Sequence, residues 1–264
     1  RSGHNIYLLD GVKVTDELFN NLVINPSVDS IEEFKIQKSQ YAAEFGGKAS
    51  ALINVATRSG SNAVRGSLFE FLRHDAFDSR GYFEPANEAK PILRQHQFGG
   101  ALGGPVARGR SFFFGSYEGQ RVRRGETKTF SVPTAAARSG RLDGLSIDPS
   151  RIDPVSRGLL AYVPLPNRPG EVQNLVAVEE QAKRVHQVSV RVDHRFTPSD
   201  QLFGRFSAFD ADETQPFGTG ALQEALLPGF GRRVDTHARN LGVNHTHAFT
   251  AAVLNELRVG WMRV

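Results

Sequence analysis

A pair of histidines separated by one residue is the most metal-like feature of the sequence. Side chains alternate between the two faces of a β-strand, so His245 and His247 would project from the same face, and imidazole is a common metal ligand. That face would also carry Leu241, Val243 and Phe249, and no carboxylate lies nearby in the sequence. We therefore expect neither a bound metal ion nor a cofactor.

Other catalytic motifs are either incomplete in this sequence or absent from it. Gly47-Lys48 is followed by Ala49, where a phosphate-binding loop needs Ser or Thr, and Ala42 occupies the position of its first glycine. The sequence has no cysteine, which excludes thiol catalysis, disulfides and Cys-ligated metals. It also contains neither G-x-S-x-G nor H-E-x-x-H. We expect no catalytic residues and therefore no enzyme.

Aromatic and basic side chains lie close together between residues 112 and 124. This combination suits a platform on which the bases of single-stranded nucleic acid stack, or an aromatic girdle at a membrane interface. The formal net charge of +4 is small for 264 residues, so we expect no nucleic-acid partner. The residues concerned are Phe112, Phe113, Phe114, Tyr117, Arg121, Arg123 and Arg124.

From Val64 onward the sequence alternates between apolar and polar residues in seven segments, which predicts seven β-strands. Most of them have about the 9–11 residues that a tilted membrane-spanning strand needs. No apolar run is long enough for a spanning helix, although that test does not apply to strands. The segments are 64–73, 94–103, 111–121, 185–196, 201–210, 237–248 and 253–263.

The connections between these segments alternate strictly between long and short. Residues 74–93, 122–184 and 211–236 are long, whereas 104–110, 197–200 and 249–252 are short. In an up-and-down antiparallel sheet, this places all long loops at one end. Bacterial outer-membrane barrels have that asymmetry, with short periplasmic turns and long extracellular loops.

The two faces of a predicted strand differ in polarity. Between Val188 and Phe196 the even positions are mainly valine and the odd positions are Ser, Arg, Asp and Arg. One face would meet lipid and the other a wet lumen, although a half-buried soluble sheet alternates in the same way. Seven is an odd number of strands, and an open sheet edge is not tolerated in lipid, so we expect further strands after Val264.

The first 62 residues have shorter and more mixed segments, which predict a small α+β unit. Asp10-Gly11 and Asn25-Pro26-Ser27 are turn signals, and either Ser27 or Ser30 is expected to cap a short helix. The strands expected here are Ile6–Leu9, Phe34–Ile36 and Leu52–Thr57.

An ordered set of short strings resembles TonB-dependent outer-membrane receptors. Leu8–Val12, Ile31–Ile36, Tyr41–Gly47 and Ile53–Gly60 are similar to the second half of their plug domain. Further strings resemble the first barrel strands of the Oar-like subgroup, and Ala51-Leu52 replaces the paired glycines of many other plugs. These strings are Arg65–Arg73, Gln97–Gly100, Gly103–Pro105, Phe112–Glu118, Arg151–Pro154, Leu165–Asn167 and Asn255–Arg258.

The resemblance implies a mainly β fold: an antiparallel transmembrane barrel of 22 strands with a plug inside. Residues 1–62 would be the C-terminal part of the plug and residues 63–264 about seven strands of the wall. It also implies the cell outer membrane of a Gram-negative-type bacterium as the location. The inner-membrane complex TonB–ExbB–ExbD would drive uptake through a segment that is not in this chain.

Two groups of residues are expected to serve this architecture. A plug must move before anything passes, so polar contacts are expected between plug and wall, from Asp10, Glu32, Glu33, Lys35, Glu44 and Arg58. Ligand capture at extracellular loops is expected from Arg73, His74, Asp75, Asp78, Arg80, Arg121, Arg123 and Arg124. The arginines are equally suited to the phosphates of lipopolysaccharide, or are simply solvated.

Three functional hypotheses remain at this point. The first is an active importer of an unknown extracellular ligand. The second is an outer-membrane surface protein for adhesion or secretion that imports nothing, and the third is a soluble β-rich binding module. The proline-rich connection between the third and fourth strands is expected to shape the entrance, so deleting 134–170 should impair binding without preventing assembly.

Overall fold

The computed structural model describes residues 5–15, 22, 24–38, 51–79, 90–142, 144–218 and 227–264. Two predicted site residues, Glu44 and Arg80, lie outside the described residues. The described part contains a large sheet of seven strands, a small sheet of four strands, and a two-stranded hairpin in a long connection. No helix among the described residues has the length and apolar character needed to cross a membrane.

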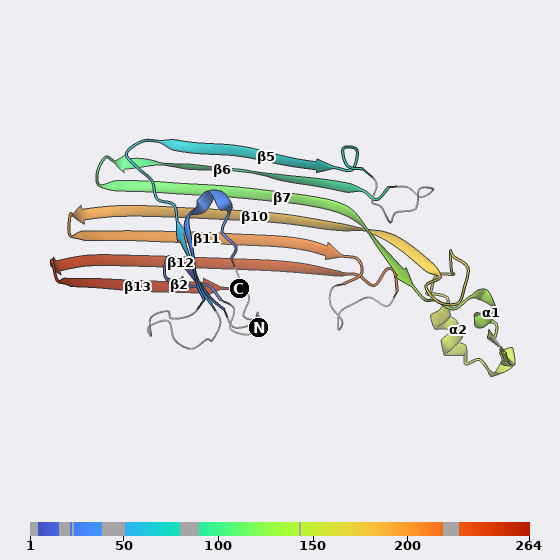
Figure 1. The fold of residues 1–264 in the computed structure, drawn as a ribbon. Coiled ribbons are helices and arrows are strands. Elements are labelled where there is room, and N and C mark those ends of the chain that lie inside the picture. Colours follow the sequence, from blue (N-terminus) through green and yellow to red (C-terminus); the bar gives the residue numbers. More distant parts are fainter. Residues whose placement is uncertain are drawn as a thin grey trace.

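The large sheet is an antiparallel meander whose strands follow one another in chain order, from β5 at one edge to β13 at the other (Figure 1). All seven strands predicted from the alternating segments are confirmed. The strands are β5 (Arg65–His74), β6 (Leu93–Ala107), β7 (Ser111–Phe130), β10 (Leu175–Thr197), β11 (Asp200–Gln215), β12 (Arg232–Thr250) and β13 (Val253–Arg263).

The long and short connections lie at opposite ends of the large sheet, as predicted. Figure 1 shows the tight turns 108–110, 198–199 and 251–252 together at one end and the long connections at the other. The predicted strand ends were wrong at four strands, however. The strands β11 and β12 stay paired as far as Gln215 and Arg232, so their connection is 216–231 rather than 211–236. The error is larger at β7 and β10. These two strands stay paired as far as Phe130 and Leu175, so the long connection between them is 131–174 rather than 122–184.

The connection 131–174 has its own folded elements at the far end of the sheet. They are α1 (Ala135–Arg138), β8 (Arg141–Leu142), β9 (Leu145–Ser146), the 3₁₀ turn η4 (Pro149–Arg151) and α2 (Pro154–Leu160). Thr134 and Asp153 cap the two α-helices with their side-chain oxygens. A buried cluster of Phe130, Val132, Leu175 and Phe217 joins the base of this connection to the strand ends.

The small sheet has the order β2-β1-β4-β3, with β1 parallel to β4. The predicted turn at Asp10-Gly11 is confirmed, and both residues have positive φ angles, 50° and 77°. The predicted helix is the 3₁₀ turn η2 (Val28–Ser30), and Ser27 stands at its N-cap without a side-chain capping bond. The strands are β1 (Ile6–Leu9), β2 (Val12–Lys13), β3 (Ile31–Gln37) and β4 (Leu52–Thr57).

The two faces of the large sheet meet different surroundings. We call the face that touches the small sheet the inner face, and it carries Ser189, Arg191, Arg205 and Asn240. The opposite, outer face is mostly apolar over the half of the sheet next to the tight turns. It carries exposed large side chains on every strand, including Leu68, Leu102, Tyr117, Val190, Phe206, Leu241, Val259 and Trp261.

Candidate functional site: the polar contact between the two sheets

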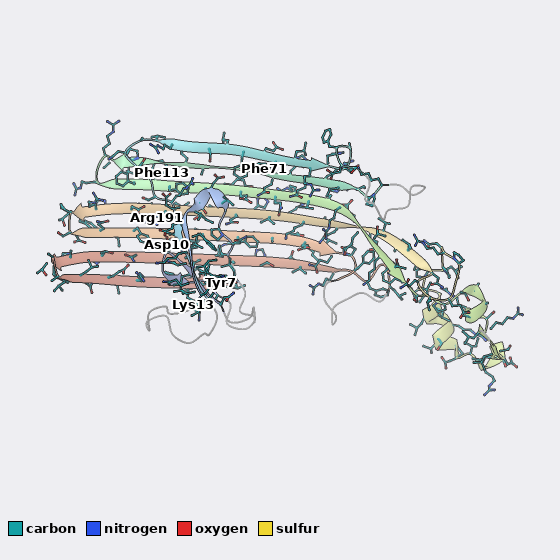
Figure 2. All side chains as sticks on the ribbon, in the orientation of Figure 1. Tyr7, Asp10, Lys13, Phe71, Phe113 and Arg191 are labelled. Atoms are coloured by element: carbon teal, nitrogen blue, oxygen red, sulfur yellow. The ribbon has the colours of Figure 1, made fainter. Side chains whose placement is uncertain are left out.

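The small sheet lies against the inner face of the last strands of the large sheet (Figures 1 and 2). Met262 on β13 packs against a small-sheet cluster that contains Leu9, Val14 and Val55. Gly260 allows the approach of β2, because a Cβ atom at this position would lie 2.3 Å from Cγ1 of Val12. The apolar part of this contact, made by Met262 and by Val12 over Gly260, is therefore narrow.

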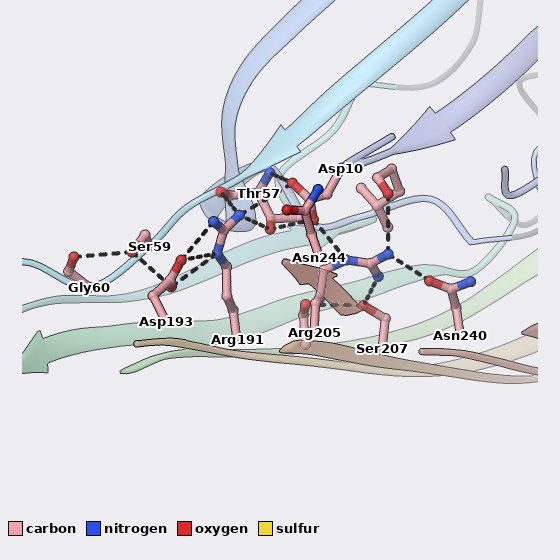
Figure 3. A network of polar contacts seen from close by, with 12 residues as sticks. Asp10, Thr57, Ser59, Gly60, Arg191, Asp193, Arg205, Ser207, Asn240 and Asn244 are labelled. Carbon is pink, nitrogen blue, oxygen red and sulfur yellow. Dashed lines mark hydrogen bonds and ion pairs between the residues drawn. The ribbon is translucent and has the colours of Figure 1, made fainter. Parts of the chain in front are cut away.

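Asp10 is the centre of the polar part of the contact (Figure 3). The left-handed turn after β1 directs its carboxylate towards the large sheet, where Nε of Arg205 donates to Oδ2 at 2.8 Å and Nη1 of Arg191 to Oδ1 at 3.3 Å. The backbone N–H and the hydroxyl of Thr57 also donate to the carboxylate, each at 2.8 Å. Asp10 thus links β1, β4, β10 and β11.

Arg205 supplies the buried positive charge of this contact. Its side chain is fully buried, which is costly for a charge unless its donors are satisfied. Besides Asp10, its guanidinium donates to the hydroxyl of Ser207 at 3.1 Å, the side-chain oxygen of Asn240 at 2.7 Å and the carbonyl of Leu9 at 3.3 Å. Asp10 and Leu9 belong to the small sheet, so the charge is satisfied only when both sheets are in place.

Arg191 extends the network to the chain segment that follows β4. Its Nη1 donates to the carbonyl of Thr57 at 3.0 Å, and its Nη2 donates to Asp193 at 2.8 Å. Asp193 in turn accepts a hydrogen bond of 2.9 Å from the hydroxyl of Ser59 (Figure 3). The guanidinium also lies 4.0 Å from the ring centroid of Phe203, within cation–π range.

The other predicted plug–wall residues in the described part of the chain lie in the small sheet or directly after it. Arg58 pairs with Glu32 at 3.5 Å, and its Nε donates to the carbonyl of Ile31. Glu33 and Lys35 are exposed on β3. Among the predicted plug–wall residues in the described part of the chain, Asp10 alone forms side-chain hydrogen bonds with the large sheet.

Sequence reasoning missed the wall residues of this contact. Arg191, Asp193 and Arg205 fall on the polar side of the alternation, which indicated the face but not the partner. Arg205 sits among glycine, phenylalanine and serine, and nothing near it in the sequence marks it as buried. The one available signal was that a charged residue on the polar side of the alternation stands next to small residues such as Gly204 and Ser207, which leave room for its side chain to be buried.

The described members of the cluster predicted at the first long connection bond to one another and to neighbouring residues. Arg73 pairs with Asp78 at 3.3 Å, and the ammonium of Lys90 donates to the carbonyls of Asp75 and Asp78. The backbone N–H of Leu93 donates to Asp75 at 3.3 Å, and this hydrogen bond is the main cause that lowers the pKa of Asp75. His74 ends β5, and its Nδ1 accepts from the N–H of Ala76.

The arginines predicted in the second long connection lie on a strand instead. Arg121, Arg123 and Arg124 belong to β7, because the β7–β10 ladder continues past the point where the apolar alternation ends. Arg123 forms two hydrogen bonds with Glu180, of 2.8 and 2.7 Å, and Arg124 donates to Gln181. Arg121 lies 3.0 Å from Nε2 of His186.

The histidine pair has a carboxylate neighbour that the sequence did not indicate. Asp200 on β11 lies 2.7 Å from Nε2 of His245 and 3.4 Å from Nδ1 of His247. Among residues 5–15, 22, 24–38, 51–79, 90–142, 144–218 and 227–264, no group of three or more side chains is arranged to hold a metal ion.

The aromatic residues near the start of β7 are divided between the two faces. Phe113 and Tyr117 lie opposite Val192 and Val188, on the outer face, whereas Phe112 and Phe114 lie opposite Asp193 and Arg191. Phe114 is buried. A single stacking platform would need these rings on one face, so the girdle interpretation fits the outer pair and the platform does not form.

Comparisons with known proteins agree with this architecture. A family model described as the outer membrane beta barrel domain matches residues 56–264. The chain is 29% identical over 137 residues to the TonB-dependent transporter Oar of Myxococcus xanthus, a match that covers 50% of this chain and 13% of Oar. The chain therefore spans a small part of that relative.

A solved structure shares the fold. The crystal structure of the outer membrane transporter YddB from Escherichia coli matches with a TM-score of 0.60 and 10% identity, over 98% of this chain and 31% of YddB. The soluble-module hypothesis is therefore wrong, and the large sheet is an antiparallel sheet of a partial transmembrane barrel. The chain belongs to the outer membrane beta barrel domain family and lies in the outer membrane.

Proposed function

We propose that this chain is part of a TonB-dependent importer in which residues 1–62 belong to the plug and residues 63–264 to the wall. The ion pair between Asp10 and Arg205 carries the proposal. It joins the small sheet to the inner face by charge and hydrogen bonds, and only a narrow apolar contact accompanies it. A polar contact that water can replace is easier to open than a dry core of the same size.

The wall continues beyond the seven strands in this proposal. Each of β5 and β13 has one neighbour in the described sheet, and in lipid every backbone N–H and C=O group needs a partner. Further strands, outside this chain, would close the sheet around the small sheet. A closed barrel of about 22 strands is of the plugged class.

The long connections face the cell exterior in this proposal, and they capture the ligand. The connection 131–174 is the largest of them, and its base is fixed by Asn174, whose amide bonds both the N–H and the carbonyl of Val132 at 2.8 Å. Arg73, Asp75 and Asp78 sit at the neighbouring connection. The energy for release would come from TonB–ExbB–ExbD, acting through a plug segment outside this chain.

A depletion assay tests import even though the ligand is unidentified. Cells with and without the full-length receptor, each with and without TonB, are grown in a complex extract of peptides and carbohydrates, and the medium is profiled by mass spectrometry. We expect at least one compound to disappear only when receptor and TonB are both present. Cells that adhere or secrete through the receptor, and deplete nothing in a TonB-dependent way, would establish the second hypothesis instead.

A further inference from the structure

The outer face of the large sheet has an apolar groove of about 770 Å³ across β5, β6 and β7. Its floor is open at Gly115, where a Cβ atom would have no neighbour closer than 4.0 Å, whereas Cδ2 of Leu68 lies over Gly100. Apolar side chains form its walls, and they are Leu68, Phe98, Leu102 and Tyr117. An extended hydrocarbon chain fits such a groove, because burial of apolar surface is its only source of affinity.

A hydrogen-bonded chain connects this groove to an arginine. Tyr117 Oη lies 2.8 Å from Nδ1 of His186, and Nη1 of Arg121 lies 3.0 Å from Nε2 of the same ring. A guanidinium only donates, so Nε2 accepts and Nδ1 carries the proton that is donated to Tyr117. The hydroxyl hydrogen of Tyr117 is therefore free for an acceptor at the edge of the groove.

Two positive charges face each other beside this tyrosine. Arg121 on β7 and Arg184 on β10 are directly opposite in register, and like charges in that position repel. Asp212, the neighbour of Arg184 on β11, is paired with Arg233, and Glu180 is paired with Arg123. In the described part of the chain, no carboxylate is hydrogen-bonded to Arg121 or Arg184.

The two arginines lie where the outer surface of the membrane is expected. Arg121 is about ten residues along β7 from Ser111, and Arg184 about ten from His194, which is the length of a spanning strand. Both are on the side of the long connections. The groove lies nearer the tight turns, at the depth of the hydrocarbon.

We propose that the groove and the two arginines bind a phosphorylated, acylated glycolipid of the outer leaflet. One acyl chain lies over Gly115, beside Leu68 and Leu102, and a phosphate monoester lies between Arg121 and Arg184 and accepts from Tyr117. A monoester carries nearly two negative charges at pH 7 and balances two guanidiniums, whereas the phosphodiester of a common phospholipid carries one. The inference rests on the proposed orientation, with the long connections outside.

Lipid retention by the purified full-length receptor tests the site, and needs neither TonB nor the transported ligand. Native mass spectrometry in detergent compares three probes: the bisphosphorylated, hexa-acylated lipid A, its dephosphorylated form, and phosphatidylglycerol. We expect the wild type to retain the first at least tenfold better than the other two. Equal retention of the dephosphorylated form, or of phosphatidylglycerol, would overturn the proposal without any variant.

Three variants and one matched control locate the site. Arg121→Gln with Arg184→Gln should weaken lipid A retention about tenfold, and Tyr117→Phe should weaken it by a smaller factor. Gly115→Leu should fill the groove at little structural cost, because the nearest atom to a Cβ there is 4.0 Å away. Arg233→Gln, on the same face but paired with Asp212 and Asp235, should retain lipid A as the wild type does.

Equal losses in Arg233→Gln and in the double variant would show a general charge effect and contradict a defined site. Failed import with intact lipid retention would count against the proposed function alone. Intact import with no phosphate-dependent retention would count against the lipid site alone.

Discussion

At the scale of single residues, Arg205 is the most constrained side chain of the wall. It is fully buried, and Asp10 is its only ionic partner among the described residues. Removing one partner of a buried ion pair leaves an uncompensated charge, which costs far more than the pair itself contributes. The small sheet and the wall are therefore energetically coupled through one carboxylate.

We predict that Asp10→Ala destabilises the attachment of the small sheet by about 3–5 kcal/mol. Urea-dependent proteolysis of the small sheet in the full-length receptor measures this, because a detached segment is cleaved before the barrel unfolds. Glu33→Gln, at an exposed position on β3, should change the stability of the attachment by less than about 0.5 kcal/mol. Equal stability of Asp10→Ala and Glu33→Gln would show that the ion pair does not hold the sheet.

Asp75 lies outside the spanning strands, and we predict that the hydrogen bond it accepts from Leu93 depends on pH. The N–H of Leu93 stabilises the ionised carboxylate, so the pKa is lowered in the folded protein. The hydrogen bond therefore contributes fully to stability above the usual Asp pKa of about 3.9. This contribution is lost as the pH falls through the lowered pKa that Asp75 has in the folded protein. Exchange of the Leu93 amide, corrected for the intrinsic rate, should be constant from neutral pH down to about pH 5 and accelerate only below about pH 4.

The Asp75→Asn variant provides the comparison for that measurement. Its amide exchange should show no such acceleration, because the side chain does not titrate. An acceleration that begins well above pH 5 in the wild type would contradict the assignment to Asp75.

At the scale of elements, the alternation of polarity predicted every strand of the large sheet, because one face meets lipid and the other water. The ends of β7 and β10 were not predictable in the same way. Beyond Arg121 polar and charged residues occupy both faces, so the pattern disappears while the backbone ladder continues to Phe130. The same loss of pattern placed Arg123 and Arg124 in a loop.

The site itself was predictable only in part. Asp10 follows a clear strand and occupies a turn, so its position at the tip of the small sheet was visible in the sequence. Its partners Arg191 and Arg205 are 181 and 195 residues away, and pairing over that distance depends on the curvature of the sheet. Local patterns contain no information about it.

The close approach of β2 to β13 makes Gly260 a sensitive position. A Cβ atom there would meet Val12 at 2.3 Å, whereas a Cβ at Gly204 meets nothing within 4 Å. We predict that Gly260→Ala increases protease cleavage of the small sheet several-fold and that Gly204→Ala leaves it unchanged. Equal cleavage of the two variants would mean that the contact at Gly260 adjusts freely.

We expect the large sheet to fold without most of the connection 131–174. Deleting 134–170 leaves Phe130, Val132, Leu175 and Phe217, which form the cluster at its base. We therefore predict that the shortened receptor still assembles, seen as a heat-modifiable band, and loses TonB-dependent depletion of the medium. Failure to assemble would show that the connection is needed for the barrel itself.

At the scale of the whole molecule, the proposed import depends on movement of the small sheet relative to the wall. A buried ion pair, a narrow apolar contact and a few further hydrogen bonds hold the small sheet and its flanking segments against the large sheet. These hydrogen bonds include Arg191 to Thr57, Ser59 to Asp193 and Gln187 to Asn25. The proposed import requires this contact to open and close. Adhesion or secretion through the exterior loops does not require it to change.

A reversible disulfide between Val12→Cys and Gly260→Cys tests this claim most directly. The two Cβ positions are 3.3 Å apart, close to the roughly 3.5–4.5 Å of a disulfide, and this chain has no other cysteine. Val243→Cys with Val259→Cys, which lie directly opposite each other on β12 and β13 and outside the polar contact, forms a matched link within the wall alone. We predict that the first link abolishes TonB-dependent depletion until a reductant is added, whereas the second has no effect. Depletion that continues at the wild-type rate with the first link closed would contradict the proposed movement.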